Sequence, residues 1–130
     1  MLPCRTHPDV LEVRWLIYQK IENWKICKDI GTALVKLAPE RSAGWIQRSF
    51  ALHEMKRTQE AYDALKPALD TFKKEQLIWH NMACYACVLG NKDEARGLLS
   101  KAIELGGDAV KTQALEDPDL QGVWVSEGEE

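Results

Sequence analysis

The sequence lacks long hydrophobic runs, and no apolar stretch approaches the ~18 residues that a membrane-spanning helix needs. Its first ten residues, MLPCRTHPDV, also lack the apolar segment of a secretion signal. Lysine and arginine form no basic block, and the formal net charge is -3. A nucleic acid or an anionic membrane would therefore find no electrostatic attraction. We expect a cytoplasmic protein that binds neither.

Cysteine and glycine are sparse as well. Four cysteines in 130 residues are too few for a disulfide scaffold, and without a secretion signal their thiols are expected to be reduced. The eight glycines are scattered rather than gathered in a phosphate-binding loop. There is no G-x-S-x-G motif and no Ser/His/Asp arrangement beyond chance. The sequence therefore predicts neither an enzyme nor a cofactor.

What the sequence does contain is an internal repeat with a period of 34 residues. Trp45 and Trp79 are separated by this period, and so are Ala68 and Ala102. The pairs Glu60-Ala61 and Glu94-Ala95, and Leu65 and Leu99, fall in the same frame. A weaker copy lies one period earlier, at Leu11, Trp15, Cys27, Gly31 and Leu34. With 45% hydrophobic and 28% charged residues, the chain has the composition of one globular domain.

Each repeat is predicted to form two helices joined by a short turn. In the third repeat the first helix spans residues 76–89, the turn is GNKD at 90–93, and the second helix spans 94–105. Gly106 and Gly107 end that second helix, because glycine adopts left-handed dihedral angles readily. The corresponding turns are KRT at 56–58 and ENW at 22–24. No strand is expected, so the predicted fold class is all-α.

This pattern resembles the tetratricopeptide repeat (TPR), whose helix pairs carry W-x2-L-G-x2-Y, then A-x3-F, then A and P. The third repeat matches at Trp79, Met82, Ala83, Gly90, Ala95, Leu99 and Ala102. The second matches at Trp45, Ser49, Leu52, Ala61, Leu65 and Ala68, and the first at Leu11, Tyr18, Trp24, Leu34 and Pro39. The resemblance implies a right-handed superhelical solenoid of antiparallel helix pairs. It also implies a non-catalytic scaffold or adaptor that binds other proteins.

The resemblance divides the chain into six segments. Residues 1–7 are an N-terminal extension, 8–41 a divergent first repeat, 42–75 the second repeat and 76–109 the third repeat. Residues 108–124 are a capping helix with a packed C-terminal segment, because the last repeat of a solenoid otherwise exposes an apolar face. Asp108 is the expected N-cap of that helix, and Leu120, Val123 and Trp124 are expected to fold back onto the last repeat. Residues 125–130 are predicted to be a disordered acidic tail.

Two departures from the TPR pattern carry their own expectations. Trp15 stands where a small residue is usual and Gly31 where a large aromatic is usual, which suggests that the indole fills the space left by glycine. Arg14 and Arg48 stand at apolar positions, so their stems are expected to pack while their charged heads reach water.

In the TPR family the first helices of successive units line a concave groove where ligands bind. By register, the resemblance places a partner-binding groove at Glu12, Leu16, Ile46, Phe50, His53, Leu77, His80, Cys84 and Cys87. The positions that clamp a partner's C-terminal carboxylate in some family members are Glu12, Leu16, Gln47, Leu77 and Asn81 here. No cation is among them, which argues against the tail of a chaperone as ligand. A protein or peptide segment with an apolar face suits the groove better.

The stretch WHNMACYACVLG, residues 79–90, leaves a second interpretation open. His80, Cys84 and Cys87 share one helix face, and His53 could supply a fourth metal ligand. A metal- or thiol-dependent protein that uses His80, Cys84 and Cys87 is therefore the alternative. A redox site is disfavoured, because reactive C-x-x-C pairs begin helices rather than sit within them. A chaperone of the secretion type or a self-associating TPR protein are further alternatives.

Overall fold

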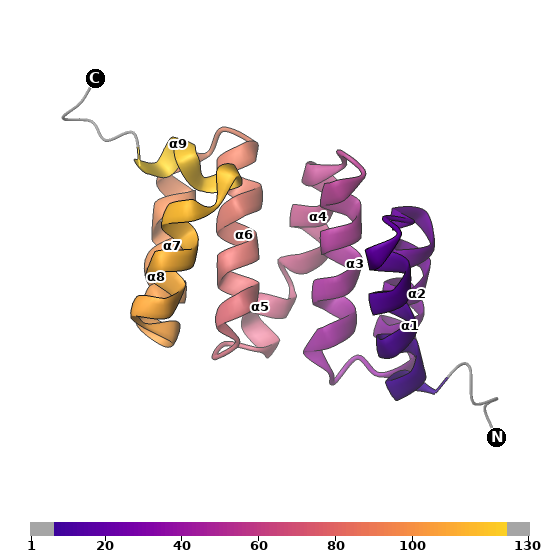
Figure 1. The fold of residues 1–130 in the computed structure, drawn as a ribbon. Helices are drawn as coiled ribbons and strands as arrows, with labels where there is room; N and C mark the ends of the chain where they lie inside the picture. The colour runs from indigo at the N-terminus through magenta and orange to yellow at the C-terminus, as the bar shows by residue number, and fades with distance from the viewer. Residues whose placement is uncertain (1–6, 125–130) are drawn as a thin grey trace. The chain divides into compact units, whose positions relative to one another are not determined.

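The computed structural model describes residues 7–124, and these residues form helices without any strand (Figure 1). Most of the expected extension 1–7 and all of the expected tail 125–130 lie outside the described residues. The described residues fall into two compact units, which are divided between Leu65 and Lys66 and are called the first and the second unit. None of its helices is long and apolar enough to cross a membrane. In chain order the helices are α1 (Pro8–Lys20), α2 (Trp24–Leu37), α3 (Ser42–Glu54), α4 (Thr58–Leu65), α5 (Ala68–Thr71), α6 (Gln76–Val88), α7 (Lys92–Gly106), α8 (Asp108–Glu116), the 3-10 helix η2 (Pro118–Leu120) and α9 (Gln121–Trp124).

The 34-residue period reappears in the backbone of the turns that follow α1, α3 and α6. Glu22, Lys56 and Gly90 are 34 residues apart, and all three have a positive φ, at 56°, 64° and 92°. The next residue in each turn donates its N–H to a carbonyl five residues earlier, over 2.9, 2.9 and 2.8 Å. This is the Schellman arrangement, which satisfies carbonyls at the end of a helix and reverses the chain. Each repeat therefore turns back on itself by the same local device.

Trp45 and Trp79, which are one period apart, make equivalent hydrogen bonds. The indole N–H of Trp45 donates to the carbonyl of Pro39 over 3.1 Å, and that of Trp79 donates to the carbonyl of Lys73 over 2.9 Å. Donor and acceptor are six residues apart in each case. The acceptors lie in the loops that lead into α3 and α6, so each indole fastens the entry to its own helix.

In the first unit, α2 packs between α1 and α3, and α3 packs against α4. Its core consists of Leu11, Trp15, Cys27, Ile30, Leu34 and Ala51, all of them buried. In the second unit, α6 packs along α7, while α8, η2 and α9 pack against these two helices. The predicted return of the C-terminal segment is confirmed for Leu120 and Val123, which are 0% and 6% exposed. The side chain of Trp124 lies outside the described residues.

Gly31 has a different role from the one expected. A Cβ atom on this residue would lie 2.7 Å from both Cα and N of Arg48, so the backbone of α3 occupies the space beside it. The expectation that Trp15 fills that space is therefore wrong. Trp15 instead packs against Trp24 and Phe50, with ring centroids 6.4 and 6.1 Å away. Glycine is needed at position 31 because two helix backbones approach each other there.

The head of Arg48 is also less hydrated than expected. Its guanidinium lies 5.3 Å from the centre of the Trp45 ring and donates to the carbonyl of Ala64 over 3.3 Å. Its Nε is buried and has no hydrogen-bond partner among the described residues. Burial lowers the pKa of Arg48 from its usual value. The charge is held by a carbonyl and an aromatic face rather than released to solvent.

Several helix boundaries differ from the sequence-based expectation, and α7, for example, begins at Lys92 rather than at residue 94. The second helix of the middle repeat is interrupted after Leu65, because Pro67 has no N–H and its ring clashes with a carbonyl of the preceding turn. The chain continues through i to i-3 hydrogen bonds to Lys66 and Pro67, over 3.1 and 3.3 Å, before α5 ends at Thr71. Asp108 is the first residue of α8 rather than its N-cap, a position taken by Gly107 with φ 71°.

Candidate functional site

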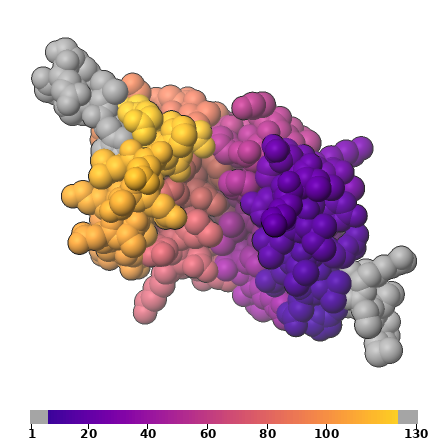
Figure 2. Space-filling model, viewed as in Figure 1, coloured from indigo at the N-terminus to yellow at the C-terminus, as the bar shows by residue number. Residues whose placement is uncertain are grey.

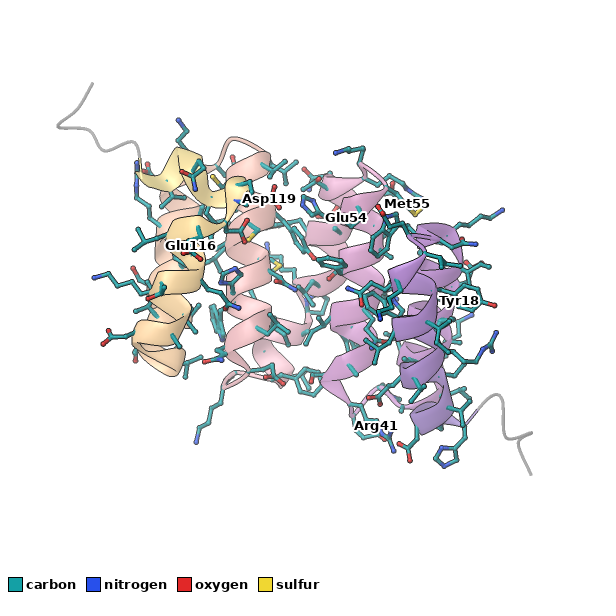
Figure 3. The ribbon with its side chains drawn as sticks, in the orientation of Figure 1. Tyr18, Arg41, Glu54, Met55, Glu116 and Asp119 are labelled. Atoms are coloured by element: carbon teal, nitrogen blue, oxygen red, sulfur yellow. The ribbon has the colours of Figure 1, made fainter. Side chains whose placement is uncertain are left out.

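The predicted groove draws residues from both units, and each unit is described by itself. In the first unit, Glu12 lies on α1 and accepts a hydrogen bond from Arg41 over 3.1 Å. The same guanidinium nitrogen contacts Asp9 at 2.7 Å, and Figure 3 shows Arg41 beside the beginning of α1. The hydrogen bond with Arg41 lowers the pKa of Asp9 below its usual range. Arg41 thus pairs with two carboxylates of its own unit, those of Asp9 and Glu12.

The remaining groove positions of α3 face different surroundings. Phe50 is half-buried in an aromatic cluster with Trp15 and Trp24, and its ring centroid lies 5.6 Å from that of Trp24. Nδ1 of His53 lies 2.9 Å from the hydroxyl oxygen of Thr58. Ile46 is partly exposed. Phe50 thus belongs to the core as much as to the surface.

An uncovered apolar stripe runs along α1. We name it the α1 stripe, and it consists of side chains that are 57%, 55%, 57% and 67% exposed, namely Val13, Leu16, Ile17 and Ile21. At 100° per residue these positions share one face of the helix, of which only Leu16 is a predicted groove residue. Figure 2 shows the indigo surface of α1 on the side of the first unit that faces the viewer. The sequence carries this signal in the spacing i, i+4, i+8 of positions 13, 17 and 21.

In the second unit, only one of the four predicted groove residues is open to solvent. Leu77 is 45% exposed, whereas His80, Cys84 and Cys87 are 9%, 5% and 9% exposed. The chain's own C-terminal segment lies over this part of α6, since η2, which carries Asp119, packs against it (Figure 3). A Cβ atom on Gly122 of α9 would lie 3.3 Å from Sγ of Cys87. The face of α6 that bears His80, Cys84 and Cys87 is thus covered by a segment of the same unit.

Under this segment, His80 and Cys84 contact Asp117, a residue that the sequence did not predict to be part of the site. Nε2 of His80 lies 3.2 Å from Oδ2 of Asp117, and the thiol of Cys84 donates to the same oxygen over 3.4 Å. Burial, and after it the charge of Asp117, raise the pKa of Cys84 well above its usual range. Nδ1 of His80 is buried and has no hydrogen-bond partner among the described residues. The three side chains form a small, buried polar cluster, to which Cys87 contributes no ligand atom.

Local signals place Asp117, although no sequence signal pairs it with α6. Asp117 precedes Pro118, and an aspartate followed by proline is typical of a helix start. Its Oδ1 accepts the backbone N–H of Asp119 over 2.9 Å and thereby caps η2. This bond fixes the carboxylate and leaves Oδ2 directed to His80 and Cys84. His53, the fourth candidate metal ligand, belongs to the first unit.

Comparison with known proteins identifies the fold. No family model matches the chain. A solved structure of MamA (MamA MSR-1 C2), a TPR helical solenoid, superposes with a TM-score of 0.69 at 22% identity, covering 82% of this chain and 61% of that one. The chain has the TPR fold. Among curated proteins, protein arginine N-methyltransferase 9 from Xenopus laevis is 27% identical over 120 residues, which cover 77% of this chain.

The chain spans only a part of these proteins. It corresponds to 14% of the length of the methyltransferase and to less than two thirds of the MamA chain. The similarity to MamA, at 22% identity, is one of fold. The fold class inferred from the 34-residue period, all-α with antiparallel helix pairs, is confirmed.

Proposed function

We propose that this TPR chain is a non-catalytic protein-interaction module that binds a helix of a partner protein. The observation that supports the proposal is the α1 stripe, where four apolar side chains are more than half exposed. Burial of such side chains contributes about 1.5–3 kcal/mol each. Exposed apolar surface of this kind marks interaction sites in soluble proteins.

The spacing of the α1 stripe favours a helical partner. Apolar side chains at i, i+3, i+4 and i+8 form the face with which one helix packs along another. Leu16 is shared with the groove position implied by the TPR register, so the register and the exposure agree at this residue. A partner helix with apolar residues at the same spacing would bury both stripes at once.

The charges around the stripe favour an acidic partner. At 100° per residue, Lys20 falls within the stripe and Arg14 at one edge, while Glu12 falls at the other edge. Asp9 also falls on this face, and the guanidinium of Arg41 contacts both carboxylates, that of Asp9 at 2.7 Å and that of Glu12 at 3.1 Å. Arg14, Lys20 and Arg41 therefore outnumber the two carboxylates beside the apolar side chains, and the expected ligand is an amphipathic helix whose apolar face is flanked by Asp or Glu.

The test compares affinity capture by three baits. The first is the wild-type chain, the second carries Leu16→Glu and Ile17→Glu in the stripe, and the third carries Val88→Glu and Leu115→Glu at matched exposed positions elsewhere. We expect proteins that the first and third baits retain and the second loses, measured by quantitative mass spectrometry. Glutamate keeps helix propensity high, so circular dichroism should be unchanged in all three.

Binding must then be shown directly. The protein lost with the second bait is purified, and its affinity for each bait is measured by calorimetry. A loss of at least tenfold confined to the stripe variant supports the proposal, whereas equal affinities contradict it. Self-association through the α1 stripe is the remaining alternative, and light scattering of the bait alone tests it. If the wild type is a dimer and the stripe variant is a monomer, the partner is a second copy of this chain, and the proposal of a different protein is overturned.

A further inference from the structure

The buried cluster in the second unit has the geometry of a metal site. His80 and Cys84 are four residues apart on α6 and therefore share a helix face. Asp117 joins them from the turn between α8 and η2. The ligand atoms Nε2, Sγ and Oδ2 lie within 4.8 Å of one another, and two of the three separations are 3.2 and 3.4 Å.

These separations match those that a bound zinc ion imposes. Zinc lies about 2.0–2.3 Å from imidazole, thiolate and carboxylate ligands, so tetrahedral ligand atoms are about 3.3–3.8 Å apart. Small shifts of the three side chains would therefore admit the ion. Mg²⁺ and Ca²⁺ prefer oxygen ligands, whereas an imidazole with a thiolate selects zinc and related transition metals.

The electrostatic surroundings also favour a cation. The Asp117 carboxylate lies against both other side chains, with Oδ2 at 3.2 Å from Nε2 of His80 and 3.4 Å from Sγ of Cys84. In the part of the chain that the structure describes, the ion-pair partner of Asp117 is His80, and no lysine or arginine is paired with it. A divalent cation would offset the negative charge of both the carboxylate and the thiolate.

The orientation of Asp117 is set by a hydrogen bond that does not involve its ligand atom. Oδ1 of Asp117 caps η2 over 2.9 Å, so Oδ2, which contacts His80 and Cys84, is the oxygen that can serve as a monodentate ligand. The Asp117 side chain is 25% exposed and that of His80 is 11% exposed, so an ion has a path from solvent on the carboxylate side. The fourth coordination position can be taken by water from that side.

We propose that His80, Cys84 and Asp117 bind a zinc ion that fastens the segment following α8 to α6. On binding, the Cys84 thiol releases its proton to solvent and its sulfur bonds to the ion. Nε2 of His80 donates its lone pair, and the ring proton resides on Nδ1. The role is structural, because the site lies under η2. It is independent of the α1 stripe, which belongs to the first unit.

The test uses cobalt as a spectroscopic substitute for zinc. The full chain without a histidine tag is reduced, stripped with a chelator and titrated with Co²⁺. We expect saturable one-to-one binding with a sulfur-to-cobalt charge-transfer band and intense visible bands of tetrahedral cobalt, all abolished by added Zn²⁺. The control is Cys27→Ala, which removes a buried cysteine of the first unit and should leave the spectrum unchanged.

Two variants decide the assignment. Cys84→Ser should lose the charge-transfer band, and Asp117→Asn should weaken cobalt binding at least tenfold. Asp117→Asn is isosteric and lies at a partly exposed position, so its fold should persist, and circular dichroism verifies this. No saturable band in the wild type, or an Asp117→Asn spectrum and affinity equal to those of the wild type, would overturn the proposal.

Discussion

Three residues with left-handed backbones, Glu22, Lys56 and Gly90, occupy the same place in successive repeats. Only one of them is glycine. A residue with a Cβ atom loses roughly 1–2 kcal/mol in this conformation. The turns of the first two repeats therefore carry a conformational free-energy penalty that the turn of the third repeat avoids. The residue at each turn thus predicts whether a substitution there raises or lowers the free energy of unfolding.

Exchanging residues at these turns should change stability in opposite directions. Lys56→Gly should raise the free energy of unfolding by about 0.5–1 kcal/mol, because glycine removes the Cβ penalty. Gly90→Ala should lower it by about 1 kcal/mol, since φ is 92° and no neighbouring atom compensates. Urea denaturation measures both values. The same sign for both variants would contradict the argument.

Two glycines inside helices form a matched pair for a second prediction. Gly31→Ala should destabilise the chain by about 1–3 kcal/mol, because its Cβ would lie 2.7 Å from the backbone of Arg48. Gly97→Ala adds the same atom where nothing lies within 4 Å. It should stabilise by about 0.5–1 kcal/mol through helix propensity. Thermal unfolding distinguishes the two, and a neutral Gly31→Ala would refute the close approach.

At the scale of elements, the C-terminal segment decides what α6 can do. η2 and α9 occupy the surface that the TPR register assigns to ligands in the second unit, and they bury His80, Cys84 and Cys87. A partner could reach these three side chains only if the segment moved away. The α1 stripe has no such cover within the first unit, which is why the proposed contact lies there.

The anchor of this segment is Leu120, which is fully buried. Leu120→Ala should cost about 2–5 kcal/mol in unfolding free energy. It should also speed hydrogen exchange in η2 and α9. Leu115→Ala is the control, since Leu115 is 49% exposed and should change stability by less than about 0.5 kcal/mol. Equal losses in the two variants would show that the segment is not held by Leu120.

For the molecule as a whole, buried thiols predict a decline in stability at alkaline pH. Burial raises the pKa of Cys27 and of Cys84 above the usual range of a thiol. Above about pH 9 the unfolded chain loses these protons while the folded chain keeps them, so unfolding becomes easier as pH rises. Each thiol contributes at most about 1.4 kcal/mol per pH unit.

The measurement is urea denaturation between pH 8 and pH 10 with a chelator present. The wild type should lose stability over this range more steeply than the double variant Cys27→Ala, Cys84→Ala. Parallel curves for the two proteins would show that the thiols ionise equally in both states.

The sequence was sufficient for the fold because the fold is periodic. Trp45 and Trp79 marked the repeat, and both make the same hydrogen bond six residues back. The candidate site could be predicted only in part. His80 and Cys84 stood out by their spacing on one helix, but Asp117 comes from a separate turn, and local pattern cannot pair residues so distant in sequence. Gly31 was misread because the atoms beside it belong to another helix backbone.

The buried cysteines are distributed so that their reactivity can report local unfolding in each unit. Cys27 lies in the first unit, while Cys84 and Cys87 lie in the second, and all three are at least nine-tenths buried. A thiol reagent can modify each of them only when the surrounding helices open. Mass spectrometry of the labelled peptides would thus time the opening of each unit separately, in one sample and without any engineered probe.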